Sequence, residues 1–191
     1  MSQQTLLARV VAALDAAAIP YMISGSLASS LQGEPRASHD IDLVVEISPA
    51  DVPRLAARLA GEPPLYLDQI GARDAVAHGT LFNLIDEHTG DKVDFWPLTS
   101  EPFDRSRFAR RRWVDALGLR LPFSAPEDTI LMKLRWAHDA GGSERQLTDA
   151  LRVYELQAAV LDHAYLDEWA AVLGVTDALA RLRDQAEPLD L

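Results

Sequence analysis

Three aspartates have the residue type and spacing of a metal-binding site. Asp40 and Asp42 are two residues apart, and Asp94 stands between Val93 and Phe95. If the first pair lies on a strand, both side chains leave the same face, where two charges about 4 Å apart repel by about 4 kcal/mol at an effective dielectric of 20. A divalent cation removes this repulsion, and Mg²⁺ prefers one or two carboxylates together with phosphate oxygens and water. The pattern therefore indicates a Mg²⁺ or Mn²⁺ site that handles a phosphate-bearing substrate.

A glycine-serine turn precedes the acidic pair. Gly25 allows a ligand close to the backbone, and the Ser26 hydroxyl with the N–H groups of the following helix can bind a phosphate. Taken alone, the dipeptide is better explained as an ordinary strand-to-helix turn, and an Asp-x-Asp pair alone is common at strand edges. Their joint occurrence is what favours a site.

The acids must be positioned by strands. The β-branched, apolar run Ile41–Ile47 is typical of a strand that is buried on both faces. Thr80–Asp86 and Lys92–Trp96 read as two strands joined by a hairpin loop, which places Asp94 inside a strand. If the Lys92–Trp96 strand lies beside the Ile41–Ile47 strand, the three carboxylates converge.

The remaining pattern predicts an α/β (α+β) fold, in which a mixed β-sheet is flanked by helices and followed by a C-terminal helical region. We expect a core at residues 1–124 and a helical region at residues 125–191, which packs on the core. Further helices are expected at Thr5–Ala18, from Pro49 until Gly61 stops the helix, and at Pro102–Arg111, Tyr165–Leu173 and Asp177–Ala186. Further strands are expected at Tyr21–Ile23 and Leu119–Leu121. Residues 62–78 are expected to form a loop with one short strand at Leu65–Leu67.

Composition excludes several classes of function. The 191 residues contain no cysteine, which rules out disulfides, thiolate zinc sites and cysteine nucleophiles. A net charge of −11 disfavours a general nucleic-acid-binding surface, and Arg110–Arg112, the densest basic run, is best read as a solvated helix end. No apolar run reaches the roughly 20 residues of a membrane span, so we expect a cytoplasmic protein without membrane contact.

Three segments together resemble the polymerase-beta-type nucleotidyltransferase superfamily: Ile23–Ser26, Asp40–Leu43 after a gap of thirteen residues, and Val93–Phe95. The resemblance implies the nucleotidyltransferase fold and transfer of a nucleoside monophosphate from a nucleoside triphosphate to an acceptor hydroxyl, with release of pyrophosphate. It also implies that Asp40, Asp42 and Asp94 are the catalytic, metal-binding acids, and that Gly25 and Ser26 hold the phosphates.

A later stretch is similar to the helical tail of the bacterial abortive-infection toxin branch of this superfamily. In that branch a lysine, then an arginine and an aspartate, lie on two helices, and Lys133, Arg145 and Asp149 match them in order. The resemblance implies that Lys133 and Arg145 bind the nucleotide phosphates, that Asp149 has a supporting role, and that a cognate antitoxin exists. The sequence departs from the toxin pattern at two places. It has Gly25-Ser26 where the branch often has Gly-Gly followed by a hydroxyl residue, and it has the single acid Asp149 where two can occur.

Several assignments stay open at this level. Judged by the residues alone, Lys133 and Arg145 are solvated helix charges. Arg36 is either a phosphate-reaching support or a surface residue, and His39 is better explained by local hydrogen bonding than by metal binding. The acceptor is RNA, a protein side chain or a small molecule, and acidity leans mildly against RNA.

Two other functions fit part of the pattern. One is a catalytically silent nucleotidyltransferase-fold module that binds or regulates. The other is a glycosyltransferase, whose Asp-x-Asp would hold manganese and a nucleotide sugar, although such an enzyme has no need of the glycine-serine turn.

Overall fold

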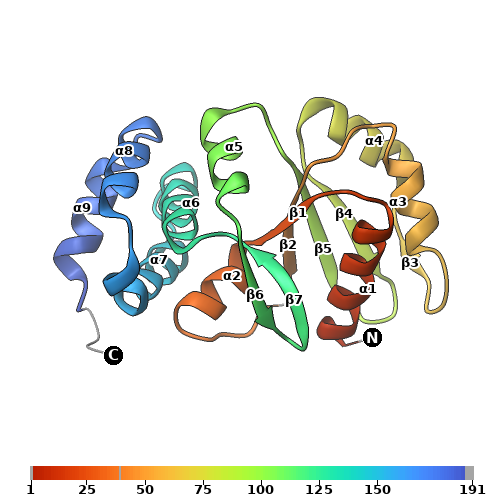
Figure 1. The fold of residues 1–191 in the computed structure, drawn as a ribbon, viewed down its shortest axis with the longest axis horizontal. Coiled ribbons are helices and arrows are strands. Elements are labelled where there is room, and N and C mark those ends of the chain that lie inside the picture. Colours follow the sequence, from red (N-terminus) through yellow and green to blue (C-terminus); the bar gives the residue numbers. More distant parts are fainter. Residues whose placement is uncertain (1, 39, 188–191) are drawn as a thin grey trace. The chain divides into compact units, whose positions relative to one another are not determined.

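A seven-stranded sheet is the main feature of the computed structural model, which describes residues 2–38 and 40–187 (Figure 1). The strand order is β3–β4–β5–β2–β1–β7–β6. Pairing is parallel between β2 and β5 and between β1 and β7, and antiparallel elsewhere. The strands are β1 (Tyr21–Ser24), β2 (Asp40–Val45), β3 (Leu65–Tyr66), β4 (Phe82–Asp86), β5 (Lys92–Pro97), β6 (Arg112–Ala116) and β7 (Leu119–Phe123). The predicted mixed sheet with flanking helices is confirmed.

The described residues form two compact units. One comprises residues 1–24 and 38–123 and contains the whole sheet, with the helices α1 (Gln3–Ala16), α3 (Val52–Leu59), α4 (Gln69–His78) and α5 (Pro102–Ala109). The other comprises residues 25–37 and 124–191, as far as they are described, and is helical. The expected division into residues 1–124 and 125–191 remains a prediction. Nowhere in the described chain is a helix both long and apolar enough to cross a membrane.

The apolar run that predicted the second strand is buried at the centre of the sheet. Ile41, Leu43 and Val45 are fully buried on one face of β2, and Val44 is buried on the other. In the same unit α1 and α3 pack against each other and bury residues such as Leu6 and Leu55. A strand covered on both faces explains why the run is nearly continuous rather than alternating.

The short strand expected at Leu65–Leu67 is confirmed as β3, but the loop expected over the rest of residues 62–78 is wrong for Gln69–His78, which forms α4. The helix begins at Asp68, whose carboxylate accepts hydrogen bonds from the backbone N–H groups of Ile70 and Gly71, both at 3.1 Å. It ends at Gly79, which has the left-handed conformation of a helix C-terminus. Both capping signals are in the sequence, but two glycines and a weak apolar pattern conceal them.

The interpretation of Arg110–Arg112 as a helix end holds only for its first residue. Arg110 caps α5, while Arg112 begins β6. Because β6 is an edge strand with mostly exposed side chains, it lacks the apolar alternation by which strands are recognised.

The helical unit is built on α6 (Pro126–Asp139) and α7 (Glu144–Gln157), which pack against each other and against α2 (Gly25–Gln32). Gly33 ends α2 close to α7, where a Cβ would lie 2.9 Å from the backbone nitrogen of Val153, so only glycine fits. A 3-10 turn at Ala158–Val160 leads to α8 (His163–Val172) and α9 (Thr176–Gln185).

Candidate active site

The three aspartates lie on adjacent, parallel strands. Asp42 of β2 is the direct register partner of Asp94 of β5, and Asp40 pairs with Lys92. Residues paired across a sheet, and residues two apart on one strand, point to the same face. The predicted adjacency of the two strands is therefore confirmed, and it brings all three acids to one face of the sheet.

A lysine contacts two of these acids. The Lys92 ammonium lies 3.5 Å from Asp40 Oδ1 and 3.6 Å from Asp94 Oδ1. Burial works to lower the pKa of Lys92, but the carboxylates of Asp94 and Asp40 outweigh it, so the net effect is a raised pKa. Lys92 is therefore a charged counter-ion that partly relieves the repulsion within the acidic cluster.

Two side chains hold the acids in place. Asn83 of β4, the register partner of Asp94 on its other side, donates from Nδ2 to Asp94 Oδ1 at 2.5 Å. Trp96 Nε1 lies 3.4 Å from Asp42 Oδ1. The Asp94 side chain is only 13% exposed, so its orientation is fixed by these neighbours rather than by water. Asn83 was not singled out from the sequence.

The same face of the sheet is apolar farther along β2. Val44, two residues after Asp42, packs with Met22 and with Phe108 of α5 in a buried cluster. This packing anchors the strands immediately beside the acids. The face is thus divided into a sealed apolar part under α5 and an acidic part at the start of β2.

The donor set fits a magnesium ion. Hard carboxylate oxygens are its preferred protein ligands, and one or two suffice when phosphate oxygens and water complete the shell. Within residues 2–38 and 40–187, no group of three or more acidic or histidine side chains is arranged as a ready metal cage. The arrangement instead pairs Asp40 and Asp94 with Lys92, whose flexible side chain can leave when a cation arrives.

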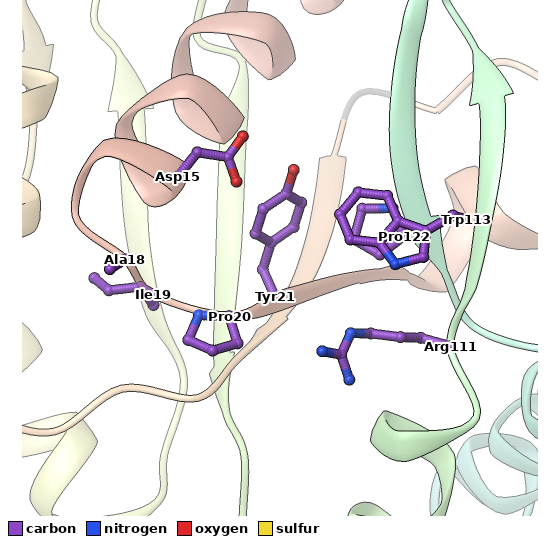
Figure 2. A pocket seen from close by; sticks show the side chains of 8 residues that line it. All are labelled: Asp15, Ala18, Ile19, Pro20, Tyr21, Arg111, Trp113 and Pro122. Atoms are coloured by element: carbon purple, nitrogen blue, oxygen red, sulfur yellow. The ribbon is translucent and has the colours of Figure 1, made fainter.

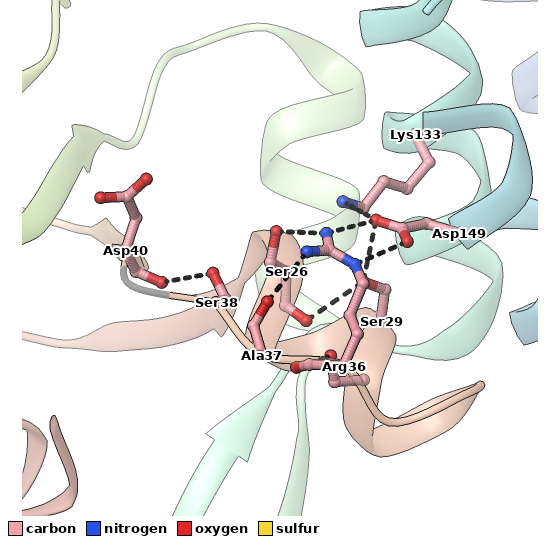
Figure 3. Close-up of polar contacts among 9 residues, drawn as sticks. Ser26, Ser29, Arg36, Ala37, Ser38, Asp40, Lys133 and Asp149 are labelled. Carbon is pink, nitrogen blue, oxygen red and sulfur yellow. Dashed lines mark hydrogen bonds and ion pairs between the residues drawn. The ribbon is translucent and has the colours of Figure 1, made fainter. Parts of the chain in front are cut away.

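A second polar cluster lies inside the helical unit (Figure 3). Asp149 of α7 accepts hydrogen bonds from Arg36 Nε at 2.9 Å, Arg36 Nη2 at 2.7 Å and Lys133 Nζ at 2.7 Å. Arg36 Nη2 also donates to Ser26 Oγ at 2.7 Å, and Ser29 Oγ donates to Asp149 at 3.4 Å. Hydrogen bonds thereby connect four residues that were predicted from the sequence: Ser26, Arg36, Lys133 and Asp149.

Two cations share one buried carboxylate in this cluster. Burial works to raise the pKa of Asp149, but hydrogen bonds from Arg36 and Lys133 outweigh it and lower the pKa. The Lys133 side chain is only 2% exposed, which contradicts its interpretation as a solvated helix charge. Asp149 is thus an acid that Arg36 and Lys133 share.

The remaining predicted residues are placed as follows. Gly25 has φ +60°, a left-handed conformation that favours glycine, and it opens α2. Arg145 is exposed in the first turn of α7. His39 lies outside the described residues.

No family model matches the chain, and no curated protein sequence matches it either. Several solved structures, however, match the chain. A solution structure of the antibiotic-resistance factor ANT(2'')-Ia is 18% identical over 95% of this chain and 96% of that one, with a TM-score of 0.55. A crystal structure of the same factor in complex with adenylyl-2''-tobramycin is 16% identical over 97% and 99%, with a TM-score of 0.50.

The fold extends to a fungal protein. An antigenic nucleotidyltransferase-like protein from Paracoccidioides brasiliensis is 18% identical over 98% of this chain and 95% of that one, with a TM-score of 0.56. In each case almost the whole length of both chains is matched. The chain therefore has the nucleotidyltransferase fold.

Proposed function

We propose that this protein is a metal-dependent nucleotidyltransferase that moves a nucleoside monophosphate from a nucleoside triphosphate to an acceptor hydroxyl. One observation carries the proposal: Asp42 and Asp94 are direct register partners, with Asp40 on the same face, in a chain with the nucleotidyltransferase fold. Three acids on one face need a cation, and a triphosphate brings its own divalent ion.

Asp40, Asp42 and Asp94 are the proposed metal ligands and catalytic residues. Bound Mg²⁺ or Mn²⁺ neutralises charge on the phosphates and favours ionisation of the acceptor hydroxyl. The acceptor oxygen forms a bond to the α-phosphorus, the bond from that phosphorus to the bridging oxygen breaks, and pyrophosphate leaves. Asp94 takes the hydroxyl proton on Oδ2, since its Oδ1 accepts the hydrogen bond from Asn83.

Gly25, Ser26, Lys133 and Arg145 are the proposed phosphate-binding residues, with Arg36 and Asp149 in supporting roles. The hydrogen bonds that connect Ser26, Arg36, Asp149 and Lys133 support this assignment, because they place two cations and the Ser26 hydroxyl in one cluster. Arg145 has the weakest support, because its side chain is exposed.

A small molecule is our preferred acceptor. The net charge of −11 disfavours RNA. Structural likeness to a factor solved with adenylyl-2''-tobramycin makes hydroxyl-bearing small molecules, tobramycin among them, the first acceptors to test. A nucleotidyltransferase toxin that acts with an antitoxin is a narrower form of the proposed transferase function. Growth arrest on expression in a bacterial host tests it.

The deciding experiment supplies each labelled nucleoside triphosphate with Mg²⁺, tobramycin and, separately, a cell lysate, and asks what becomes labelled. Asp42→Asn and Asp94→Asn should lower the transfer rate by about a hundredfold or more, because each removes a group acting on the reacting atoms. Asp74→Asn is a matched control, since that side chain is 76% exposed. Full transfer by Asp94→Asn would refute the assigned role.

The competing proposal is a silent binding module. It predicts that triphosphate with Mg²⁺ raises the melting temperature without any labelled product or pyrophosphate. Stabilisation that persists in Asp40→Ala and Asp42→Ala would place the bound nucleotide elsewhere and contradict both proposals.

A further inference from the structure

A cavity of about 330 Å³ lies in the sheet-containing unit, away from the acids (Figure 2). It is lined by the end of α1, the start of β1 and the β6–β7 hairpin. Its polar groups are Asp15, Tyr21 and Arg111, and Trp113 and Pro122 form an apolar wall. This volume is at the lower end of the range for small-molecule sites.

The cavity is separate from the proposed active site. Tyr21 pairs with Val45 at one end of the β1–β2 ladder, while Ser24 pairs with Asp42 at the other. Asp42 and Val45 are three residues apart on one strand, so their side chains point to opposite faces. A ligand beside Tyr21 therefore occupies the other face and the other end of the strand pair.

The Tyr21 side chain brings a hydroxyl to the cavity. The residue is only 4% exposed, and among the described residues no group forms a hydrogen bond with its phenol oxygen. Burial and the nearby Asp15 carboxylate raise its pKa to about 12, so the hydroxyl stays protonated. The hydroxyl can therefore donate a hydrogen bond to a ligand or a bound water in the cavity.

Opposite charges stand on the two sides of Tyr21. Figure 2 shows the Asp15 carboxylate on one side and the Arg111 guanidinium on the other. The guanidinium is fixed 4.3 Å from the centre of the Phe108 ring, and Nη1 donates to the Phe108 carbonyl at 2.5 Å. That bond uses one of five N–H donors, so the others remain for an acid group.

The indole of Trp113 completes the site. It is 54% exposed, and its strand partner Pro122 supports it from β7. The ring of an exposed indole can stack on another aromatic ring.

We propose that this cavity binds a small aromatic molecule that carries an amine and an acid group on one carbon atom, which is the chemistry of an aromatic amino acid. The amine contacts Asp15 and the Tyr21 oxygen, the ring lies on Trp113, and the acid group pairs with Arg111. This site is independent of the proposed catalytic function.

Calorimetric titration with L-phenylalanine, phenethylamine and 3-phenylpropionate tests the proposal, with tryptophan fluorescence as a second readout. L-phenylalanine should bind saturably, and each analogue should bind about tenfold more weakly, since each lacks one charged hydrogen-bonding group. Binding should persist in Asp42→Asn, because that residue lies on the other face. Absence of saturable binding at millimolar concentrations, or equal binding of all three probes, would overturn the proposal.

Two variants assign the contacts. Asp15→Asn should abolish the preference for L-phenylalanine over 3-phenylpropionate, and Arg111→Gln should abolish the preference over phenethylamine. Asp74→Asn and Arg73→Gln, at exposed positions outside the cavity, are the matched controls. Unchanged preferences in Asp15→Asn and Arg111→Gln would contradict the assignment of charges.

Discussion

Loss of the shared carboxylate at Asp149 should cost far more stability than loss of either cation that it binds. Asp149→Asn leaves the Lys133 ammonium 2% exposed and without its carboxylate. At 2.7 Å, two unit charges attract by about 6 kcal/mol at an effective dielectric of 20. An amide oxygen and local relaxation recover part of this, so we expect a loss of about 3–5 kcal/mol, the usual cost of breaking a buried pair.

Lys133→Met should cost about 1–2 kcal/mol, because the carboxylate keeps both hydrogen bonds from Arg36 and the methionine fills the space. Arg54→Met is the matched control: its 2.8 Å pair with Asp51 is exposed on the arginine side, so removing it should cost less than about 1 kcal/mol. Urea unfolding of the four proteins gives these free energies. If Lys133→Met cost as much as Asp149→Asn, the reasoning about the shared carboxylate would be wrong.

The pH dependence provides a second check on the same residue. The folded-state pKa of Asp149 lies below the ordinary 3.8, so the ionised carboxylate stabilises the fold above that pH. This stability is lost as pH falls through the folded-state pKa. Asp149→Asn should therefore lose less stability than the natural protein when the pH is lowered below about 4.

Three further outcomes are expected. Lys92→Met should remove the counter-ion of Asp40 and Asp94, which lowers the stability of the metal-free protein and tightens Mg²⁺ binding severalfold. Calorimetry measures the Mg²⁺ affinity, and an unchanged affinity would contradict this prediction. Asn83→Ala should lower kcat about tenfold with little change in KM for the triphosphate, since Asn83 orients Asp94 rather than the nucleotide. A change confined to KM would argue against this role of Asn83. Between pH 10 and about 12 the natural protein should lose stability as unfolded Tyr21 ionises, and Tyr21→Phe should lose less over the same range, as followed by urea unfolding.

The acidic cluster could be predicted because its signals are local. Asp40 and Asp42 share a face by strand alternation alone, and the apolar neighbours of Asp94 placed it in a strand. Asn83 could have been found by the same reasoning: the hairpin between β4 and β5 pairs Ile85 with Lys92, and counting two residues along each strand pairs Asn83 with Asp94.

The helical cluster could not be predicted in the same way. Arg36 and Asp149 are separated by 113 residues, and no periodic pattern records which helices pack together. Periodicity shows that a residue lies on an apolar or polar face of its own helix, but the burial of Lys133 depends on α6 packing against α7. Charged residues in helices are usually solvated, so the usual interpretation was wrong at this position.

The assignment of α2 to the helical unit has a consequence for synthesis on the ribosome. Ser29 of α2 bonds to Asp149, 120 residues later in the chain, and the backbone at Gly33 packs against that of Val153. During translation α2 therefore emerges long before α7, the helix that it packs against. Until then its inward face has no native cover, and exposed apolar surface of this kind makes a partly folded chain prone to association.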